Sequence, residues 1–224
     1  VDRYAEDSSF ENLLIGYAFD DGPVEVIDLT DPVTDIAQVK RQFAEWLLDA
    51  AIKKTAWNAA FEMTCFTHWL GQEMIPEQWS DTMITAATCG LPMSLGGAGK
   101  ALDLPQDAQK DRRGKELIRY FCVPCKPTQS NGGRTRNMPG DAPDKWATFI
   151  EYNRQDVVTE RAIRKRLESY EPDADEHEAW CLDYRINRRG VLCDRPLAEA
   201  SISIAEEHSK LLTAKMKALT GLAN

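Results

Sequence analysis

A long helical pattern in the second half of the chain is the strongest constraint on its fold. From Pro143 to Tyr170 the apolar residues recur at about 100° per residue and form one stripe, made of Trp146, Phe149, Ile150, Val157 and Leu167. Tyr152 and Asp156 lie four residues apart at the edge of that stripe, so in a helix they share one face. We therefore expect this pair to point into a cleft rimmed by core residues.

The preceding residues alternate between strand and helix patterns. Residues 13–19 and 24–29 predict two strands, and Asp20-Asp21-Gly22-Pro23 between them is a strong hairpin signal. Further on we predict a strand and five helices, in this order: a helix over 35–52, a strand over 53–57, and helices from Asn58 to about Leu70 and over 81–88, 94–102 and 110–121. Residues 124–137 are rich in Pro, Gly, Ser and Asn and predict a long surface loop. The order indicates an α/β domain.

The last fifty or so residues predict a separate helical unit. An acidic, helix-breaking linker at 171–175 is followed by helical patterns over 177–189 and 196–219. We therefore divide the chain into an α/β domain over residues 1–170 and a helical segment over residues 171–224.

Bulk composition excludes several classes of protein. No stretch of 18 apolar residues occurs, so no spanning helix and no membrane partner is expected. A net charge of −9 argues against a protein that coats duplex DNA, although a deep acidic site could take a nucleic-acid end through metal ions. The sequence opens at Val1 without a signal peptide, and we interpret it as a segment of something larger.

Six cysteines at irregular spacings are typical of reduced intracellular thiols. Cys122 and Cys125 form the only Cys-x-x-Cys pair, and a structural zinc would need a second pair. We interpret these two residues as loop thiols.

Two motifs carry the chemistry. Tyr152 and Asp156 place a hydroxyl one turn from a carboxylate, which suits holding a water beside a metal-bound phosphate. Asn58 and Glu62 repeat the same spacing, and Glu62 could help to hold a second metal ion. Many nucleases use two divalent cations, held mainly by carboxylates, to stabilise an in-line displacement at phosphorus. No Asp-x-Glu precedes Asn58 to complete such a site.

Each of these residues also has a purely structural interpretation. Asn58 is a good helix N-cap, and Glu62 alone is more often a solvated helix glutamate. Tyr152 and Asp156 alone could form an exposed helix face. The basic residues Lys126, Arg134 and Arg136 in the long loop are candidate contacts to a DNA backbone.

In combination these motifs resemble the 3′–5′ proofreading exonuclease domain of phage-type family A (polymerase I-like) DNA polymerases. Asn58–Glu62 is similar to the second exonuclease motif, Asn-x-x-x-Asp, with Glu in place of Asp, and Asp81-Thr82-Met83 is similar to the stretch that follows it. Tyr152–Asp156 is similar to the third motif, Tyr-x-x-x-Asp, of the tyrosine branch of the DEDD superfamily. Ile186–Asp194 is similar to the stretch that opens the polymerase thumb.

The resemblance implies an RNase H-like domain joined to the start of a helical thumb. By position, Asp156 would bind a metal directly, Tyr152 would orient the attacking water, and Glu62 would hold the second ion. Asn58 would contact the 3′-terminal nucleotide, and Trp57 and Phe61 could stack on frayed bases. The implied cofactor is a pair of Mg²⁺ or Mn²⁺ ions, and the implied partners are a single-stranded 3′ end of DNA and the rest of the polymerase chain, in the cytoplasm of a phage-infected bacterium.

The absence of an Asp-x-Glu also has a consequence for the sheet. In the family's fold it lies on a central strand, between the hairpin and the strand over residues 53–57, and a sheet without that strand would leave unpaired backbone groups. We therefore expect the segment alone to be weakly active or inactive. Two alternatives stay open: an RNA-trimming exonuclease of the RNase D kind, and a non-catalytic module that braces a polymerase or binds DNA.

Overall fold

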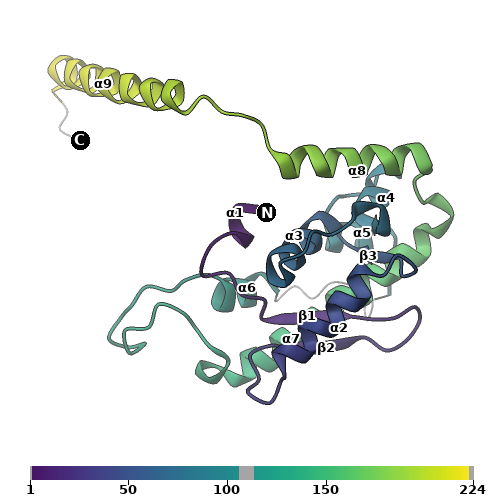
Figure 1. Cartoon of the computed structure of the whole chain (residues 1–224). Coiled ribbons are helices and arrows are strands. Elements are labelled where there is room, and N and C mark those ends of the chain that lie inside the picture. Colours follow the sequence, from purple (N-terminus) through teal and green to yellow (C-terminus); the bar gives the residue numbers. More distant parts are fainter. Residues whose placement is uncertain (1, 106–113, 222–224) are drawn as a thin grey trace. The chain divides into compact units, whose positions relative to one another are not determined.

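A computed structural model of the 224-residue chain describes residues 2–105 and 114–221 (Figure 1). It is a mixed α/β structure. Its strands are β1 (Leu14–Tyr17), β2 (Glu25–Asp28), β3 (Lys54–Ala56) and β4 (Trp79–Asp81). Its α-helices are α1 (Asp2–Ala5), α2 (Ile36–Leu48), α3 (Ala59–Leu70), α4 (Thr82–Thr88), α5 (Leu95–Ala101), α6 (Gly114–Cys122), α7 (Pro143–Leu167), α8 (Ala174–Arg189) and α9 (Arg195–Thr220). Short 3₁₀ turns occur at Pro76–Gln78, Pro139–Asp141 and Glu168–Tyr170.

The chain forms two compact units, Val1–Tyr184 and Arg185–Asn224. The first unit continues past the linker expected at 171–175, because Trp180 and Tyr184 of α8 pack into one of its core clusters. The second unit contains the end of α8 and the long helix α9, which buries none of its side chains. No helix in the described part of the chain is long and apolar enough to cross a membrane.

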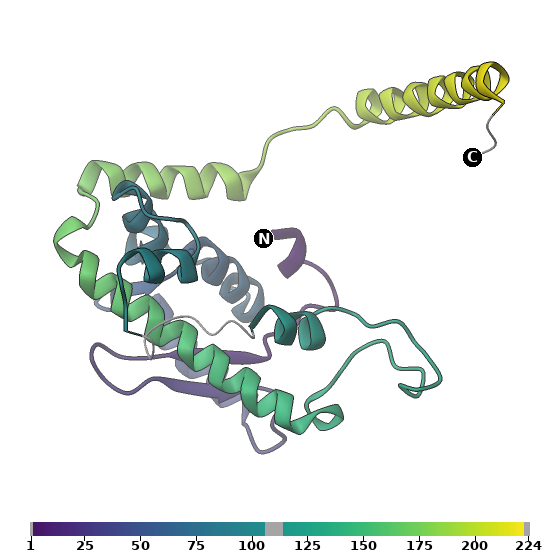
Figure 2. The ribbon, with the colours of Figure 1, turned by 180° about the vertical axis from the view of Figure 1, so that it is seen from behind.

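The predicted hairpin is confirmed and lies between two helices. Antiparallel pairing of β1 with β2 sets Leu14 opposite Asp28. In Figure 1 α2 lies in front of the hairpin, and in the reverse view of Figure 2 α7 lies in front of it. Side chains alternate accordingly: Ile15 and Tyr17 pack in the core cluster with α2, whereas Leu14 packs in the cluster that contains α7 residues.

Aromatic packing holds α2 on the hairpin. Phe43 is buried, and its ring lies 5.4 Å from Tyr17, 5.2 Å from Trp46 and 5.9 Å from Phe66, measured between ring centroids. Aromatic pairs at such distances add to the free energy gained by burying apolar area. Phe43 therefore connects α2 to both β1 and α3.

Helix α7 holds the opposite face of the hairpin with hydrogen bonds. The indole N–H of Trp146 donates to Asp28 Oδ2 at 2.6 Å. Arg154 donates to the carbonyl of Val24, and Arg161 donates to that of Gly22 at 2.8 Å. Arg161 is half-buried, and its guanidinium supplies a donor to a carbonyl of the hairpin turn.

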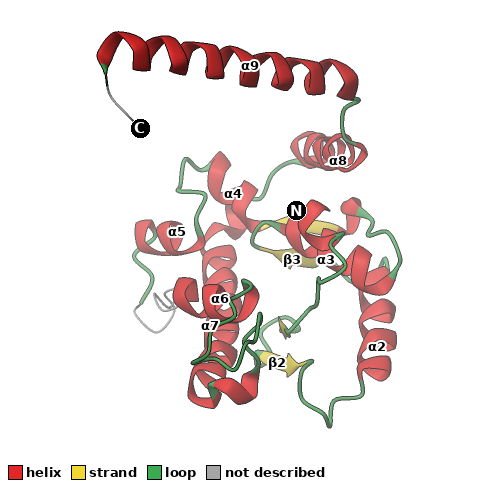
Figure 3. Ribbon diagram, turned by 90° about the vertical axis from the view of Figure 1, so that its left-hand side faces the viewer, coloured by secondary structure: helices red, strands yellow, loops and turns green. Residues whose placement is uncertain are grey.

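The described strands form two separate sheets. β3 pairs in parallel with β4, setting Lys54 opposite Trp79, and no ladder joins this pair to the hairpin among the described residues. Figure 3 shows the strands as two separate yellow groups. The division falls between the hairpin and β3, where the family's central strand was expected. The structure supports a mixed α/β fold, and it does not by itself define an RNase H-like sheet.

Most predicted helices are confirmed with shorter bounds, and strand β4 was missed. The first residues of the helix expected over 110–121 lie outside the described part of the chain, which resumes with α6 at Gly114. The loop at 124–137 is confirmed, and one side chain organises it: Asn131 accepts from the backbone N–H groups of Thr128 and Gly133 and donates to the carbonyl of Lys126.

We predict that Phe43→Ala lowers the free energy of unfolding by about 3–5 kcal/mol, because it removes a buried ring that four aromatic neighbours contact. Urea denaturation followed by circular dichroism measures the change. Val33→Ala is the control, since Val33 is 88% exposed and should cost less than about 0.5 kcal/mol. Equal losses in the two variants would contradict the assigned role of Phe43.

Candidate functional site

The site begins where β3 turns into α3. Asn58 adopts a left-handed backbone conformation with φ of 65°, and it stands at the N-cap position as predicted. Its side chain makes no cap hydrogen bond, so the prediction that the Asn58 side chain caps the helix is wrong. The backbone N–H groups of Asn58 and Ala59 donate instead to the two carboxylate oxygens of Asp81, at 2.9 and 3.0 Å. A carboxylate from β4 thus caps α3.

Asp81 also caps its own helix. Its Oδ1 accepts from the backbone N–H of Met83 at 2.9 Å, so one buried carboxylate serves the N-termini of α3 and α4. Burial raises the pKa of Asp81, and its backbone hydrogen bonds oppose that rise. The role of Asp81 was not assigned from the sequence, although an Asp directly before a helical pattern is a capping signal.

Glu160 of α7 is a second buried carboxylate near this junction. Its Oε1 accepts from the hydroxyl of Thr82 at 2.5 Å, which ties α7 to α4. Burial raises the pKa of Glu160, whereas the Thr82 hydrogen bond and the guanidinium groups of Arg164 and Arg161 lower it. Glu160 lies four residues after Asp156, and no motif in the sequence singles it out.

Glu62 shares this acidic environment. Its Oε2 is buried and has no hydrogen-bond partner in the described structure. The pKa of Glu62 is raised to about 8, mainly by burial and with smaller contributions from the negative charges of Asp81 and Glu160. The structure thus brings Glu62 near two carboxylates, neither of which was predicted as a ligand. The interpretation of Glu62 as a solvated helix glutamate is therefore wrong, because its Oε2 is buried.

Tyr152 lies in a core cluster and is only 5% exposed. Its ring stacks on Phe149 at 6.1 Å between centroids, and Gly114 of α6 lies so close that a side chain there would collide with the ring. Asp156, one turn further along α7, is half-buried. The expectation that Tyr152 points into a cleft rimmed by core residues is therefore wrong for the ring, which lies within the core because α6 covers that face of α7.

The two predicted stacking residues differ in accessibility. Trp57 is half-buried and packs against the core cluster that contains Leu104 and Ile163. Phe61 is 39% exposed, and its ring stacks on Tyr4 of α1 at 6.1 Å between centroids. One face of the Phe61 ring thus contacts Tyr4 of α1. Phe61 is more accessible to solvent than Trp57, but only part of its ring is exposed.

The described residues do not fit a two-metal site. Within residues 2–105 and 114–221 no group of three His, Cys, Asp or Glu side chains is placed to hold a metal ion. Glu62 and Asp156 supply two of the carboxylates that the resemblance requires, and the sequence lacks the Asp-x-Glu that would bridge the ions. Glu62 and Asp156 together are too few ligands for two metal ions. All six cysteines are free thiols, as predicted.

The basic loop is partly neutralised within the protein. Arg134 pairs with Asp141 at 3.2 Å, and Arg136 pairs with Glu11 at 2.7 Å. Lys126 is exposed. The loop is thus a weaker candidate for phosphate contacts than its composition indicates.

The geometry defines an α/β protein with a buried acidic junction beside two helix N-termini. The chain is 46% identical over all 224 residues to a protein named DNA polymerase from Bacillus phage SP02. It spans 34% of the length of that relative. No protein-family model matches the chain, and no solved structure matches it.

We predict that Asp81→Ala costs at least about 2 kcal/mol of the free energy of unfolding, since it leaves the N–H groups of Asn58 and Ala59 without their acceptor. Asp35→Ala is the matched control. Asp35 caps only α2, through Gln38 N–H at 3.0 Å at an exposed site, and its loss should cost about 1 kcal/mol. Thermal and urea unfolding of both variants measure the difference, and a smaller loss for Asp81→Ala would refute the double-cap assignment.

We also predict that wild-type stability falls, relative to Glu62→Gln, as pH rises from about 5 to 8 in the presence of EDTA. The pKa of Glu62 is raised from 4.5 to about 8 on folding, so the folded state binds the proton more tightly in that window. The stability that Glu62 contributes when protonated is fully present below pH 4.5. As pH rises from there toward 8, the free energy of unfolding falls by up to roughly 1.4 kcal/mol per pH unit. Glu45→Gln, an exposed glutamate of α2, is the control and should follow wild type.

Proposed function

We propose that the chain is a region of a phage-type DNA polymerase, built on the architecture of a 3′–5′ proofreading exonuclease domain and acting at the single-stranded 3′ end of DNA. The observation that carries this proposal is the similarity of the whole chain to the phage SP02 DNA polymerase at 46% identity. The order of the motifs adds to it, because Asn58–Glu62, Asp81–Met83 and Tyr152–Asp156 all occur within that matched region.

Packing in the structure supports the residue roles in part. Glu62 and Asp156 lie on α3 and α7, the two helices that the resemblance assigns to the second and third motifs. Burial and the neighbouring carboxylates of Asp81 and Glu160 raise the pKa of Glu62 to about 8, and perturbed carboxylates of this kind cluster at functional sites. Asn58, Trp57 and Phe61 gather around the start of α3, and Phe61 keeps enough exposed surface to meet a terminal base.

The 224 residues alone should hydrolyse DNA weakly or not at all. The described carboxylates near Glu62 are already engaged, Asp81 as a double helix cap and Glu160 with Thr82. Activity in this proposal therefore requires two further carboxylates from a segment outside these residues.

A second candidate is a non-catalytic module that braces a polymerase or binds DNA. Two observations favour it: the absence of a three-ligand metal cluster from the described part of the chain, and the burial of Tyr152 under α6. An RNA exonuclease of the RNase D kind has no comparable support, since the matching relative is named a DNA polymerase.

The deciding experiment compares hydrolysis of a 3′-labelled single-stranded DNA in Mg²⁺ by the 224-residue chain and by a natural version that extends about forty residues further upstream. We expect activity only in the longer version, and a loss of roughly a hundredfold or more in Asp156→Ala. Asp144→Ala, on the exposed first turn of α7, should leave the rate unchanged.

Two outcomes would contradict the nuclease assignment. No activity in either length would favour the bracing module. Equal losses in Asp156→Ala and Asp144→Ala would show that the site does not include Asp156.

A further inference from the structure

The exposed side of α6 carries two cations that have no ion-pair partner among the described residues. Gly114, Leu117 and Phe121 bury one side of this helix, so its opposite side faces solvent. Lys115 and Arg119 lie four residues apart on the exposed side, which corresponds to about 6 Å along the helix axis. Neither side chain forms an ion pair within the part of the chain that the structure describes. Both are therefore available to an anionic partner.

The basic residues of the loop that follows α6 are used differently. Arg134 pairs with Asp141, and Arg136 pairs with Glu11, so both guanidinium groups are already neutralised. Lys126 is exposed, lies four residues after the end of α6, and has no ion-pair partner among the described residues. The available positive charge of this region thus lies on α6 and at Lys126.

The N-terminal end of α6 lies against the candidate site. Gly114, its first residue, lies so close to Tyr152 that a Cβ there would collide with the tyrosine ring. The resemblance assigns Tyr152 to orienting the attacking water. Lys115 directly follows Gly114, so the cationic side of α6 begins next to Tyr152.

The C-terminal end of α6 lies near the ring pair formed by Tyr4 and Phe61. Burial raises the pKa of Tyr4, and the nearby thiol of Cys122, the last residue of α6, contributes to the rise. Tyr4 in turn stacks on Phe61 at 6.1 Å between ring centroids. The nine residues of α6 span about 13 Å. The helix therefore runs from Tyr152 toward the ring that is predicted to stack on a base.

Apolar side chains are interleaved with these cations. Ile118 is exposed on the same side of α6, and Val123 is exposed just past its end. The one carboxylate of α6, Glu116, lies 3.9 Å from Lys145 of α7. Proteins that bind single strands combine cations for the backbone with apolar or aromatic contacts for the unpaired bases. The exposed side of α6 has this composition.

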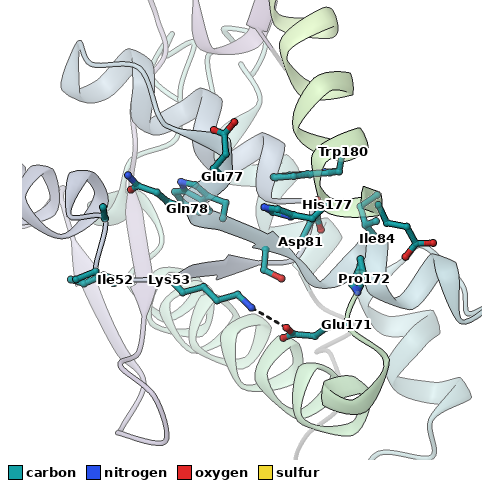
Figure 4. Close-up of a pocket in the computed structure, with 15 residues that line it drawn as sticks. Ile52, Lys53, Glu77, Gln78, Asp81, Ile84, Glu171, Pro172, His177 and Trp180 are labelled. Atoms are coloured by element: carbon teal, nitrogen blue, oxygen red, sulfur yellow. Dashed lines mark hydrogen bonds and ion pairs between the residues drawn. The ribbon is translucent and has the colours of Figure 1, made fainter. Parts of the chain in front are cut away.

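The cavity of about 390 Å³ beside β4 is a poor alternative for a phosphate backbone (Figure 4). Glu171 and Glu176 line it with exposed carboxylates, and Lys53 is the one lysine or arginine among its described lining residues. Lys53 is held by Glu171, with 2.9 Å between Nζ and Oε2. A phosphate there would meet like charges and an occupied lysine, so charge favours α6.

We propose that the exposed side of α6 binds the phosphate backbone of single-stranded DNA. Lys115 and Arg119 contact phosphates between Tyr152 and Phe61, and Lys126 extends the path past the end of the helix. The inference rests on the proposed function and deepens it, because it assigns nucleic-acid binding to three residues outside the matched motifs.

The test measures binding of a 5′-fluorescein-labelled ten-residue oligothymidine to the 224-residue chain in EDTA, by fluorescence anisotropy. Lys115→Gln with Arg119→Gln should weaken binding roughly tenfold at about 50 mM salt. The slope of log affinity against log salt should become less steep by about 1.4, because each phosphate contact to a single strand contributes about 0.7. The urea midpoint should match wild type, since both side chains are exposed.

A second double variant separates this surface from general attraction to cations. Arg41→Gln with Lys100→Gln removes the same charge from exposed positions on α2 and α5 and should leave the affinity and the slope unchanged. In the longer version that includes the upstream residues, the α6 variant should raise KM for the labelled DNA more than it lowers kcat, because these contacts also form before the reaction.

Three results would overturn the inference: no saturable binding by wild type, equal weakening in the two double variants, or an α6 variant with unchanged affinity and slope. Binding is measured without hydrolysis, so the two proposals can fail separately. Binding that depends on α6, with no hydrolysis by the longer version, would contradict the exonuclease assignment alone. Hydrolysis with an unchanged KM in the α6 variant would contradict only the path along α6.

Discussion

The first unit depends on the close approach of α7 to β1 at Gly16. A Cβ at this position would collide with Asn153 Oδ1 and would lie 3.0 Å from Val157, so the absence of a side chain at Gly16 leaves room for these two α7 side chains. The approach lets α7 touch the hairpin on one side and α4, α5 and α6 along its length. Trp146 and Arg161 then fix both ends of the hairpin through Asp28 and Gly22. Gly16 and the two hydrogen bonds thus join β1, β2 and the hairpin turn to a single 25-residue helix.

Asp81 joins the N-termini of α3 and α4, next to the candidate site residues Asn58 and Glu62. A substitution of Asp81 would therefore affect both the stability of the fold and the candidate site. Burying a carboxylate costs free energy, which its three backbone hydrogen bonds offset while they satisfy the N-termini of α3 and α4. Glu160 is likewise engaged with Thr82. Glu62 differs from both, because a buried oxygen of its side chain has no partner in the described structure. Among these carboxylates Glu62 is therefore the one whose placement the fold alone does not explain.

Local signals predicted the hairpin and the long helix, since turn residues and a 3.6-residue period are properties of neighbouring positions. Strand β4 was missed because three residues, Trp79–Asp81, are too few to show a period, and their parallel partner lies far away in the sequence. The burial of Tyr152 was missed for a related reason. A periodic stripe identifies one buried face, whereas α7 also receives α6 on the face that carries Tyr152, and a contact with a distant element leaves no trace in the local pattern. The residues of the candidate site could be selected by motif. The proximity of Asn58 and Glu62 to Asp81 and Glu160 could not be predicted in this way, because it arises from tertiary packing.

The division of the strands into two sheets and the shortage of metal ligands have one common physical explanation under the proposed function. β1 and β3 each pair with a single strand among the described residues, so each keeps an edge whose backbone groups need partners. A strand bearing Asp-x-Glu between them would satisfy both edges and would also bring two carboxylates toward Glu62 and Asp156. Ladder hydrogen bonds and metal ligands would then come from the same few residues. Stability of the sheet and nuclease activity should consequently be gained together, whereas a bracing module would gain the first without the second.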